Sequence, residues 1–405
     1  MSARVIAPVN PKVLAWARNE SGYDIDSAAS KLRMKPERLA EWEKENGKEL
    51  PSLRQAERLA KVYHRPLPIL FLNEPPPVVP FASEFRRLPG VRPGDESPEL
   101  RLALRTLRRR REIALELMDE NDEQPFSFKL SARLREDAEV VGQRLRETLG
   151  ITISEQRSWS DEYEAWRIWR DRTEGLNILV FQIPYVSLRQ MRGISLFREP
   201  LPVVGVNSKD HPLARIFTLI HEITHLMLLV SGDEKTASDE KRKTSEWNEL
   251  ERFTDSVAAA TLMPRDVILA DQDVAGHKGQ EPWNSDEVLH LARRYRVSQV
   301  AFMTRLATLN RVSWVFYSKW RSAWEKKWEN RPKPKQTGGP SRTETILSRV
   351  GPTYASLVMD SLARDFITPL AASDALDLKV HHFDSLKSAL MFGTEPPPLS
   401  EGSEG

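Results

Sequence analysis

The residues best suited to chemistry lie in one short stretch of this 405-residue chain. Within residues 215–227 the pattern His-Glu-x-x-His, formed by His221, Glu222 and His225, lies on an apolar background with helical period. Residues four apart share a helical face, so the two imidazoles can converge on one zinc ion, and Glu222 can reach a water at the metal. The stretch predicts two zinc ligands and a catalytic base. The alternative is that both histidines are buried in a helical core, where hydrogen bonds and not a metal pair their ring nitrogens.

A catalytic zinc site needs a third protein ligand, with its fourth position left for water. Residues 247–264 read as a second helix, on which Glu251 and Asp255 share a face one turn apart. We expect Glu251 to be the third ligand. Asp255 can accept a hydrogen bond from the free N–H of a liganding imidazole, which fixes the tautomer of that ring. Glu249, on another side of this helix, and His211, in a preceding loop, are the rival ligands.

These two motifs, taken together, resemble the metallopeptidases of the ImmA/IrrE family. The matching positions are Arg215-x-x-Thr218-x-x-His221-Glu222-x-x-His225, then Glu251-x-x-x-Asp255-x-x-Ala258-x-x-x-Leu262-Met263-Pro264. The resemblance covers about residues 11–330, and the segment Phe85-Arg86-Arg87-Leu88-Pro89-Gly90 shares it. It implies that His221, His225 and Glu251 bind zinc and that Glu222 is the general base of a zincin-like α+β domain.

The chain departs from that family at two positions. Many members carry Gly or Ala before the second histidine, where this chain has Thr224. They often have Asn at the position of Asp255, which here is similar to the Glu-x-x-x-Asp helix of gluzincin proteases. Neither change removes a ligand.

Composition narrows the chemistry and the expected location. The chain has no cysteine, which excludes disulfides, thiolate ligands and a cysteine nucleophile, so any metal must be held by His, Asp or Glu. Its net charge is +2, from 60 basic and 58 acidic residues, so the overall charge argues neither for nor against binding of nucleic acid. The start lacks the apolar run of a signal peptide, and no uninterrupted apolar stretch reaches the roughly 18 residues of a membrane span. We expect a cytoplasmic protein without a membrane segment.

Two proline-rich segments divide the chain. Its parts are expected to be a helix-turn-helix bundle (1–73), a linker (74–96), the metallopeptidase domain (97–329), a second linker (330–342), a small helical unit (343–392) and a disordered tail (393–405). The fold class is therefore mainly α with a small β-sheet. Strands are expected at residues 176–183 and 201–207, the second at a sheet edge because of Pro202. An edge strand beside a zinc site can hold an extended peptide by strand addition.

The first segment carries four short apolar faces that must pack together as a bundle. Its second and third helices, with a tight turn between them, resemble phage-repressor-like helix-turn-helix domains of the Cro/C1 or xenobiotic-response type. If this segment binds DNA, Lys35 and Arg38 are the candidate contacts. Glu37 and Glu41 on the same helix would face phosphates, so a protein-interaction or dimerisation module is the alternative. The cluster Arg105 and Arg108–Arg111 is a further candidate for a polyanion, or simply a solvated helix face.

Two functions from different classes fit these patterns. The first is a zinc-dependent intracellular endopeptidase that acts in regulation by cleaving one protein partner, such as a repressor. The second is an antitoxin-like, DNA- and protein-binding partner of a toxin, with a structural or vestigial zinc site. Residues 351–383 resemble the tails of ImmA/IrrE-type proteins encoded beside nuclease-like toxins. Either function is compatible with a homodimer.

Overall fold

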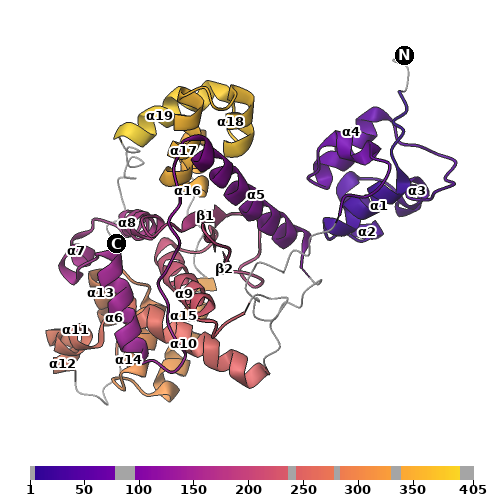
Figure 1. Cartoon of the computed structure of the whole chain (residues 1–405). Helices are drawn as coiled ribbons and strands as arrows, with labels where there is room; N and C mark the ends of the chain where they lie inside the picture. Colours follow the sequence, from indigo (N-terminus) through magenta and orange to yellow (C-terminus); the bar gives the residue numbers. More distant parts are fainter. Residues whose placement is uncertain (1–4, 78–95, 236–242, 278–282, 330–338, 393–405) are drawn as a thin grey trace. The chain divides into compact units, whose positions relative to one another are not determined.

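The structure is a computed structural model, and it describes residues 5–77, 96–235, 243–277, 283–329 and 339–392 (Figure 1). The predicted tail, most of both predicted linkers and the segment 85–90 lie outside these residues. The described chain is mainly helical, with one three-stranded sheet. It forms two compact units, which meet in sequence between residues 108 and 109, and each is described here by itself.

The first unit packs short helices around one apolar core. The helices are α1 (Pro11–Glu20), α2 (Ile25–Leu32), α3 (Pro36–Trp42), α4 (Leu53–Val62) and the 3-10 helix η1 (Leu67–Phe71). The start of the longer helix α5 (Pro98–Glu120) also belongs to this unit. Leu14, Leu39, Trp42 and Leu59 are fully or almost fully buried in this core. Arg33 ends α2 in a left-handed conformation, which makes the turn into α3 tight. The helix-turn-helix assignment of this unit stays a prediction.

The second unit contains the sheet and the remaining helices. They are α6 (Ala138–Leu149), α7 (Ile153–Ser158), α8 (Glu162–Glu174), β1 (Leu179–Ile183), β2 (Gly193–Leu196), β3 (Val203–Asn207), α9 (Pro212–Ser231), α10 (Thr244–Leu262), α11 (Arg265–Ala270), α12 (Gln272–Gly276), α13 (Ser285–Arg294), α14 (Gln299–Thr308), α15 (Trp314–Glu329), α16 (Arg342–Val350), α17 (Pro352–Ala363), α18 (Pro369–Leu376), η3 (Val380–His382) and α19 (Phe383–Phe392).

The sheet corrects one expectation from the sequence. Its strand order is β1-β3-β2, with β1 parallel and β2 antiparallel to β3, so the strand after Pro202 is central and not at an edge. Pro202 lies just before the first residue of β3, where its missing N–H is not needed by the ladder, and its carbonyl accepts a hydrogen bond from the N–H of Leu179 (3.0 Å). The edge strand β2 is too short to have been predicted.

Helix α9 is the core of this unit. Pro212 begins it and Gly232, with a left-handed φ of 79°, ends it. It packs against β2, β3, α8 and α10 (Figure 1). Of the described helices, α9 has the length and hydropathy of a membrane span, but 72% of its apolar window is buried inside the fold. Its apolar surface is therefore used in packing.

Helix α10 crosses α6 at close range. A β-carbon on Gly142 of α6 would lie 2.7 Å from the β-carbon of Ala260. Ala260 makes this contact with α6, while Ala258 lies in the core that α9 shares.

The arginine cluster on α5 includes a buried structural residue. Arg111 is 3% exposed, and its guanidinium donates hydrogen bonds to the carbonyls of Leu201, Arg198 and Glu199 at 2.7–2.9 Å. These bonds hold the chain that leads into β3. Arg111 is therefore neither a solvated residue nor available to a polyanion.

Of the C-terminal helices, α16 packs against β1 and α17 against α8, while α18 and α19 pack on these two helices. The buried Arg170 of α8 donates to the carbonyls of Val180 and Ser348 and pairs with Glu174 (2.9 Å). Glu174 also accepts a hydrogen bond from the hydroxyl of Thr353 at 2.5 Å. Burial raises the pKa of the Glu174 carboxyl. This ion pair attaches the C-terminal helices to the sheet at the β1 edge.

Gly351 provides a test of this attachment. Its φ is +85°, and a β-carbon there would lie 2.6 Å from Oε1 of Glu174. Gly232→Ala meets no atom within 4 Å, so it should cost only the left-handed backbone strain of about 1 kcal/mol. Gly351→Ala should cost roughly 1–3 kcal/mol more, because its backbone (φ 85°, ψ 157°) is less accessible to alanine than that of Gly232 and because the β-carbon overpacks the ion pair. Urea unfolding of both variants measures this, and equal costs would contradict it.

Candidate metal centre

Helices α9 and α10 bring three ligand-bearing side chains together. One ligand atom from each of His221, His225 and Glu251 lies within 4.8 Å of the other two. The Nε2 atoms of the histidines are 2.9 Å apart, and the carboxylate oxygens of Glu251 lie 3.5 Å and 3.6 Å from them. These three residues could hold a metal ion.

The other nitrogen of each imidazole faces a carboxylate. His221 Nδ1 lies 2.9 Å from Oδ1 of Asp255, and His225 Nδ1 lies 2.7 Å from Oε2 of Glu234. An ionised carboxylate can only accept a hydrogen bond, so both Nδ1 atoms carry the proton. When both rings are neutral, both Nε2 lone pairs then point into the cluster. This is the orientation in which histidine binds a metal through Nε2.

The donor set fits a divalent cation. Two lone pairs 2.9 Å apart repel each other unless a proton or a metal ion lies between them. Burial opposes protonation of the His221 ring, but its hydrogen bonds to Asp255 and Glu251 raise its pKa to about 10. Two imidazole nitrogens and a carboxylate oxygen suit Zn²⁺.

Glu222 points to the sheet side of α9. The residue is fully buried, and its Oε1 lies 2.8 Å from the position that a β-carbon on Gly193 would occupy. Gly193 is the first residue of β2, and a side chain there would also collide with Thr218. The glycine lets β2 approach α9 closely enough to enclose Glu222 (the predicted base).

The structure also separates the predicted ligand from its rivals. Glu249 is exposed on α10 and is not one of the three clustered residues. His211 is the N-cap of α9, where its ring accepts a hydrogen bond from the N–H of Leu213 (3.3 Å). Neither residue belongs to the cluster formed by Glu251.

Two contributors to this site were missed in the sequence. Glu234 comes nine residues after His225, beyond the end of α9, where no helical spacing indicates it. Gly193 lies in a four-residue strand with no clear alternation. A glycine in a strand is a general signal of close backbone approach, yet it does not say which side chain approaches.

The candidate DNA contacts lie in the first unit. Lys35 is exposed at the start of α3, and Arg38 lies 3.6 Å from Glu49 and over the ring of Trp42. Glu41 accepts hydrogen bonds from the side chain of Lys44 and the N–H of Lys48, both at 2.9 Å. The lysine neighbours lower the pKa of Glu41 and compensate part of its charge. DNA binding stays a prediction.

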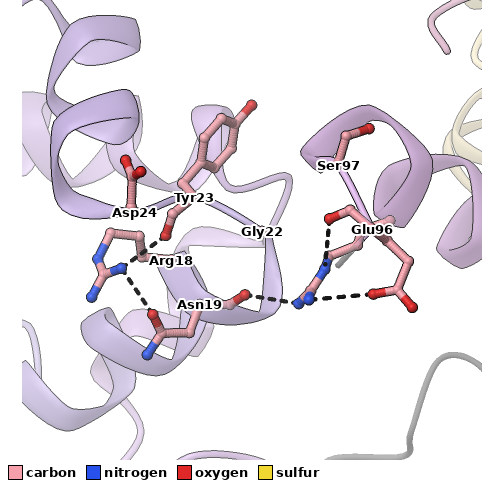
Figure 2. Close-up of a pocket in the computed structure, with 8 residues that line it drawn as sticks. Arg18, Asn19, Gly22, Tyr23, Asp24, Glu96 and Ser97 are labelled. Carbon is pink, nitrogen blue, oxygen red and sulfur yellow. Dashed lines mark hydrogen bonds and ion pairs between the residues drawn. The ribbon is translucent and has the colours of Figure 1, made fainter. Parts of the chain in front are cut away.

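The first unit contains a shallow pocket of about 510 Å³ (Figure 2). Its charged residues are two arginines and two acids, Arg18, Arg101, Asp24 and Glu96. Arg18 donates to Asn19 and to the carbonyl of Tyr23, and Arg101 pairs with Glu96 (3.3 Å). The two positive and two negative charges of the lining balance, so no excess charge of one sign selects a ligand.

Comparison with known proteins covers the region that contains the candidate metal centre. Residues 174–307, about a third of the sequence, match the family model Peptidase_M78, described as the IrrE N-terminal-like domain. The match contains β1–β3, α9 and α10, and the family is one of metallopeptidases. No curated protein matches the chain. The match supports the family resemblance of the metal-centre region and leaves the first unit untested.

The metal assignment can be tested on α10. The purified protein should contain about one zinc per chain. Glu251→Ala should lower zinc affinity about a hundredfold or more, because it removes a charged ligand, whereas the exposed Glu249→Ala should keep full affinity. Elemental analysis and chelator competition measure both. Equal retention of zinc in the two variants would refute the assignment.

Proposed function

We propose that this chain is a zinc-dependent regulatory endopeptidase that cleaves a specific protein partner. The observation that carries the proposal is the convergence of His221 Nε2, His225 Nε2 and the Glu251 carboxylate. The match of residues 174–307 to a metallopeptidase family supports it. His221, His225 and Glu251 would hold the ion, and Glu222 would be the general base.

The residues divide the chemistry among them. A bound Zn²⁺ supplies Lewis acidity, which polarises the peptide carbonyl and makes a water molecule more acidic. Glu222 accepts a proton from the attacking water as its oxygen bonds to the carbonyl carbon, and it passes that proton to the departing amine when the C–N bond breaks. Asp255 and Glu234 hold the two imidazole rings in place throughout.

The edge strand β2 suggests how a substrate would be held. The carbonyl of Arg192 accepts a hydrogen bond from the N–H of Asn207 (2.8 Å), so every second residue of this segment faces β3. The backbone groups of Gly193 and Ser195 then point away from β3, and Gly193 lies next to Glu222. An extended segment of a partner could pair there by strand addition. All four residues of β2 are buried, so the partner must first open this edge.

That burial also favours a second function. Glu222 and His225 are fully buried, as expected of a site that does not meet substrate. The second candidate is therefore an antitoxin-like partner, which neutralises a toxin by covering a surface and keeps its zinc as a structural element. In that case DNA contacts through the first unit would serve regulation of its own gene.

Glu222→Gln separates the two functions. The amide has nearly the same shape, so the fold and the metal content should be retained, but it cannot take the proton from water. A peptidase should lose about a hundred- to ten-thousand-fold in cleavage rate. A neutralising partner should keep its full effect.

The measurement is made in cells that express wild type or Glu222→Gln beside the product of the neighbouring gene. Both survival and the length of that product are followed. Loss of the effect, with an uncut partner still bound to the variant, supports the peptidase. Full activity of the variant with an uncut partner would contradict the peptidase function and support the antitoxin-like function.

Binding of DNA by the first unit has its own test. If it binds, Lys35 and Arg38 should make the contact, and affinity should fall steeply with salt because phosphate contacts release counterions. The double variant Lys35→Ala, Arg38→Ala should then lose most of its affinity in a gel-shift titration. Tight, sequence-selective binding by the double variant would exclude these residues as the contacts.

A further inference from the structure

We infer that Glu234 is a positioning residue, which fixes the ring of His225 with Nδ1–H toward itself and Nε2 toward the metal centre. The inference deepens the proposed zinc site and rests on it. Glu234 Oε2 lies 2.7 Å from His225 Nδ1, and both side chains are completely buried. The family pattern of His-Glu-x-x-His and Glu251 does not contain this residue.

The turn after α9 brings Glu234 back onto the helix. Gly232 ends the helix in the left-handed conformation that favours glycine, and a β-carbon at this position would meet no atom within 4 Å. The N–H of Glu234 then donates to the carbonyl of Leu228 (3.1 Å). This reversal places residue 234 beside His225, one turn earlier in the helix than Leu228.

Asp233 fixes the same turn from the outside. Its carboxylate accepts a hydrogen bond from the N–H of Leu134 (2.8 Å), and its own N–H donates to the hydroxyl of Ser231 (3.3 Å). The Ser231 hydroxyl in turn donates to the carbonyl of Leu228 (2.9 Å). The backbone of Glu234 is therefore held through the preceding turn, which preorganises its carboxylate.

The two imidazoles have unequal partners. The side chain of Asp255, behind His221, is 59% exposed, whereas that of Glu234, behind His225, is 0% exposed. Water screens a carboxylate at the surface, while a buried carboxylate interacts with its partner in a low dielectric. Glu234 should therefore restrict its ring more strongly than Asp255 does.

Such a restriction acts on the metal in two ways. An acceptor at Nδ1 excludes the tautomer with its proton on Nε2, which could not bind a metal through that atom. A negative acceptor also makes the imidazole a stronger donor, and partners of this kind are worth about 10- to 100-fold in metal affinity. A residue that only stabilised the fold would change unfolding without changing the tautomer.

Two variants divide these contributions. Glu234→Gln keeps an oxygen that can accept from Nδ1–H but removes the charge, and Glu234→Leu keeps a similar volume but removes the acceptor. Glu249→Gln on the exposed side of α10 is the matched control. Zinc affinity is measured by chelator competition. The His225 tautomer is read in the metal-free protein from ¹⁵N-histidine NMR spectra, which do not depend on activity.

We expect zinc affinity to fall in the order wild type, Glu234→Gln, Glu234→Leu, with a total loss of about 10- to 100-fold. His225 should carry its proton on Nδ1 in the wild type and lose that preference in Glu234→Leu. Zinc affinity within twofold of wild type and an unchanged tautomer in Glu234→Leu would overturn the inference. A wild type with the expected tautomer that takes up no zinc would support the orientation by Glu234 and overturn the zinc centre.

Discussion

The arrangement of this site depends on two imidazoles that face each other across 2.9 Å, each held from behind by a carboxylate. Two neutral rings with their Nε2 lone pairs at this distance would repel each other. The carboxylates of Asp255 and Glu234 fix both protons on the outer nitrogens, and the Glu251 carboxylate closes the third side. The cluster therefore gathers carboxylates around a centre suited to a cation.

The fold holds this arrangement in a rigid frame. Helix α9 is buried by the sheet on one side and by α8 and α10 on others, so its two histidines cannot turn away from each other. Helix α10 carries Glu251 and is held by the close crossing at Gly142 and Ala260. The C-terminal helices attach at β1, the edge opposite β2. These helices therefore do not attach at the β2 edge, which lies next to Glu222.

The same packing makes the site closed. Gly193 brings β2 against Glu222, and all residues of that strand are buried. A base enclosed in this way is protected from bulk water, which suits either a peptidase that waits for its partner or a zinc site that only stabilises a binding surface. Both readings use the same ligands and differ in whether the β2 edge opens.

The spacing of His221 and His225 predicted one helix that carries both imidazoles on one face, because this spacing is a property of a single helix and needs no tertiary information. The sequence also indicated Glu251 and Asp255, since a one-turn spacing selects a common face. It could not find Glu234, which reaches His225 through a left-handed turn at Gly232 and not through any period. The central position of β3 likewise follows only from the pairing between strands. Pro202 removes one backbone N–H just before the strand, and this does not prevent strands from pairing with both sides of the residues that follow. Distances across a turn or a sheet arise from packing, and a linear pattern does not encode them.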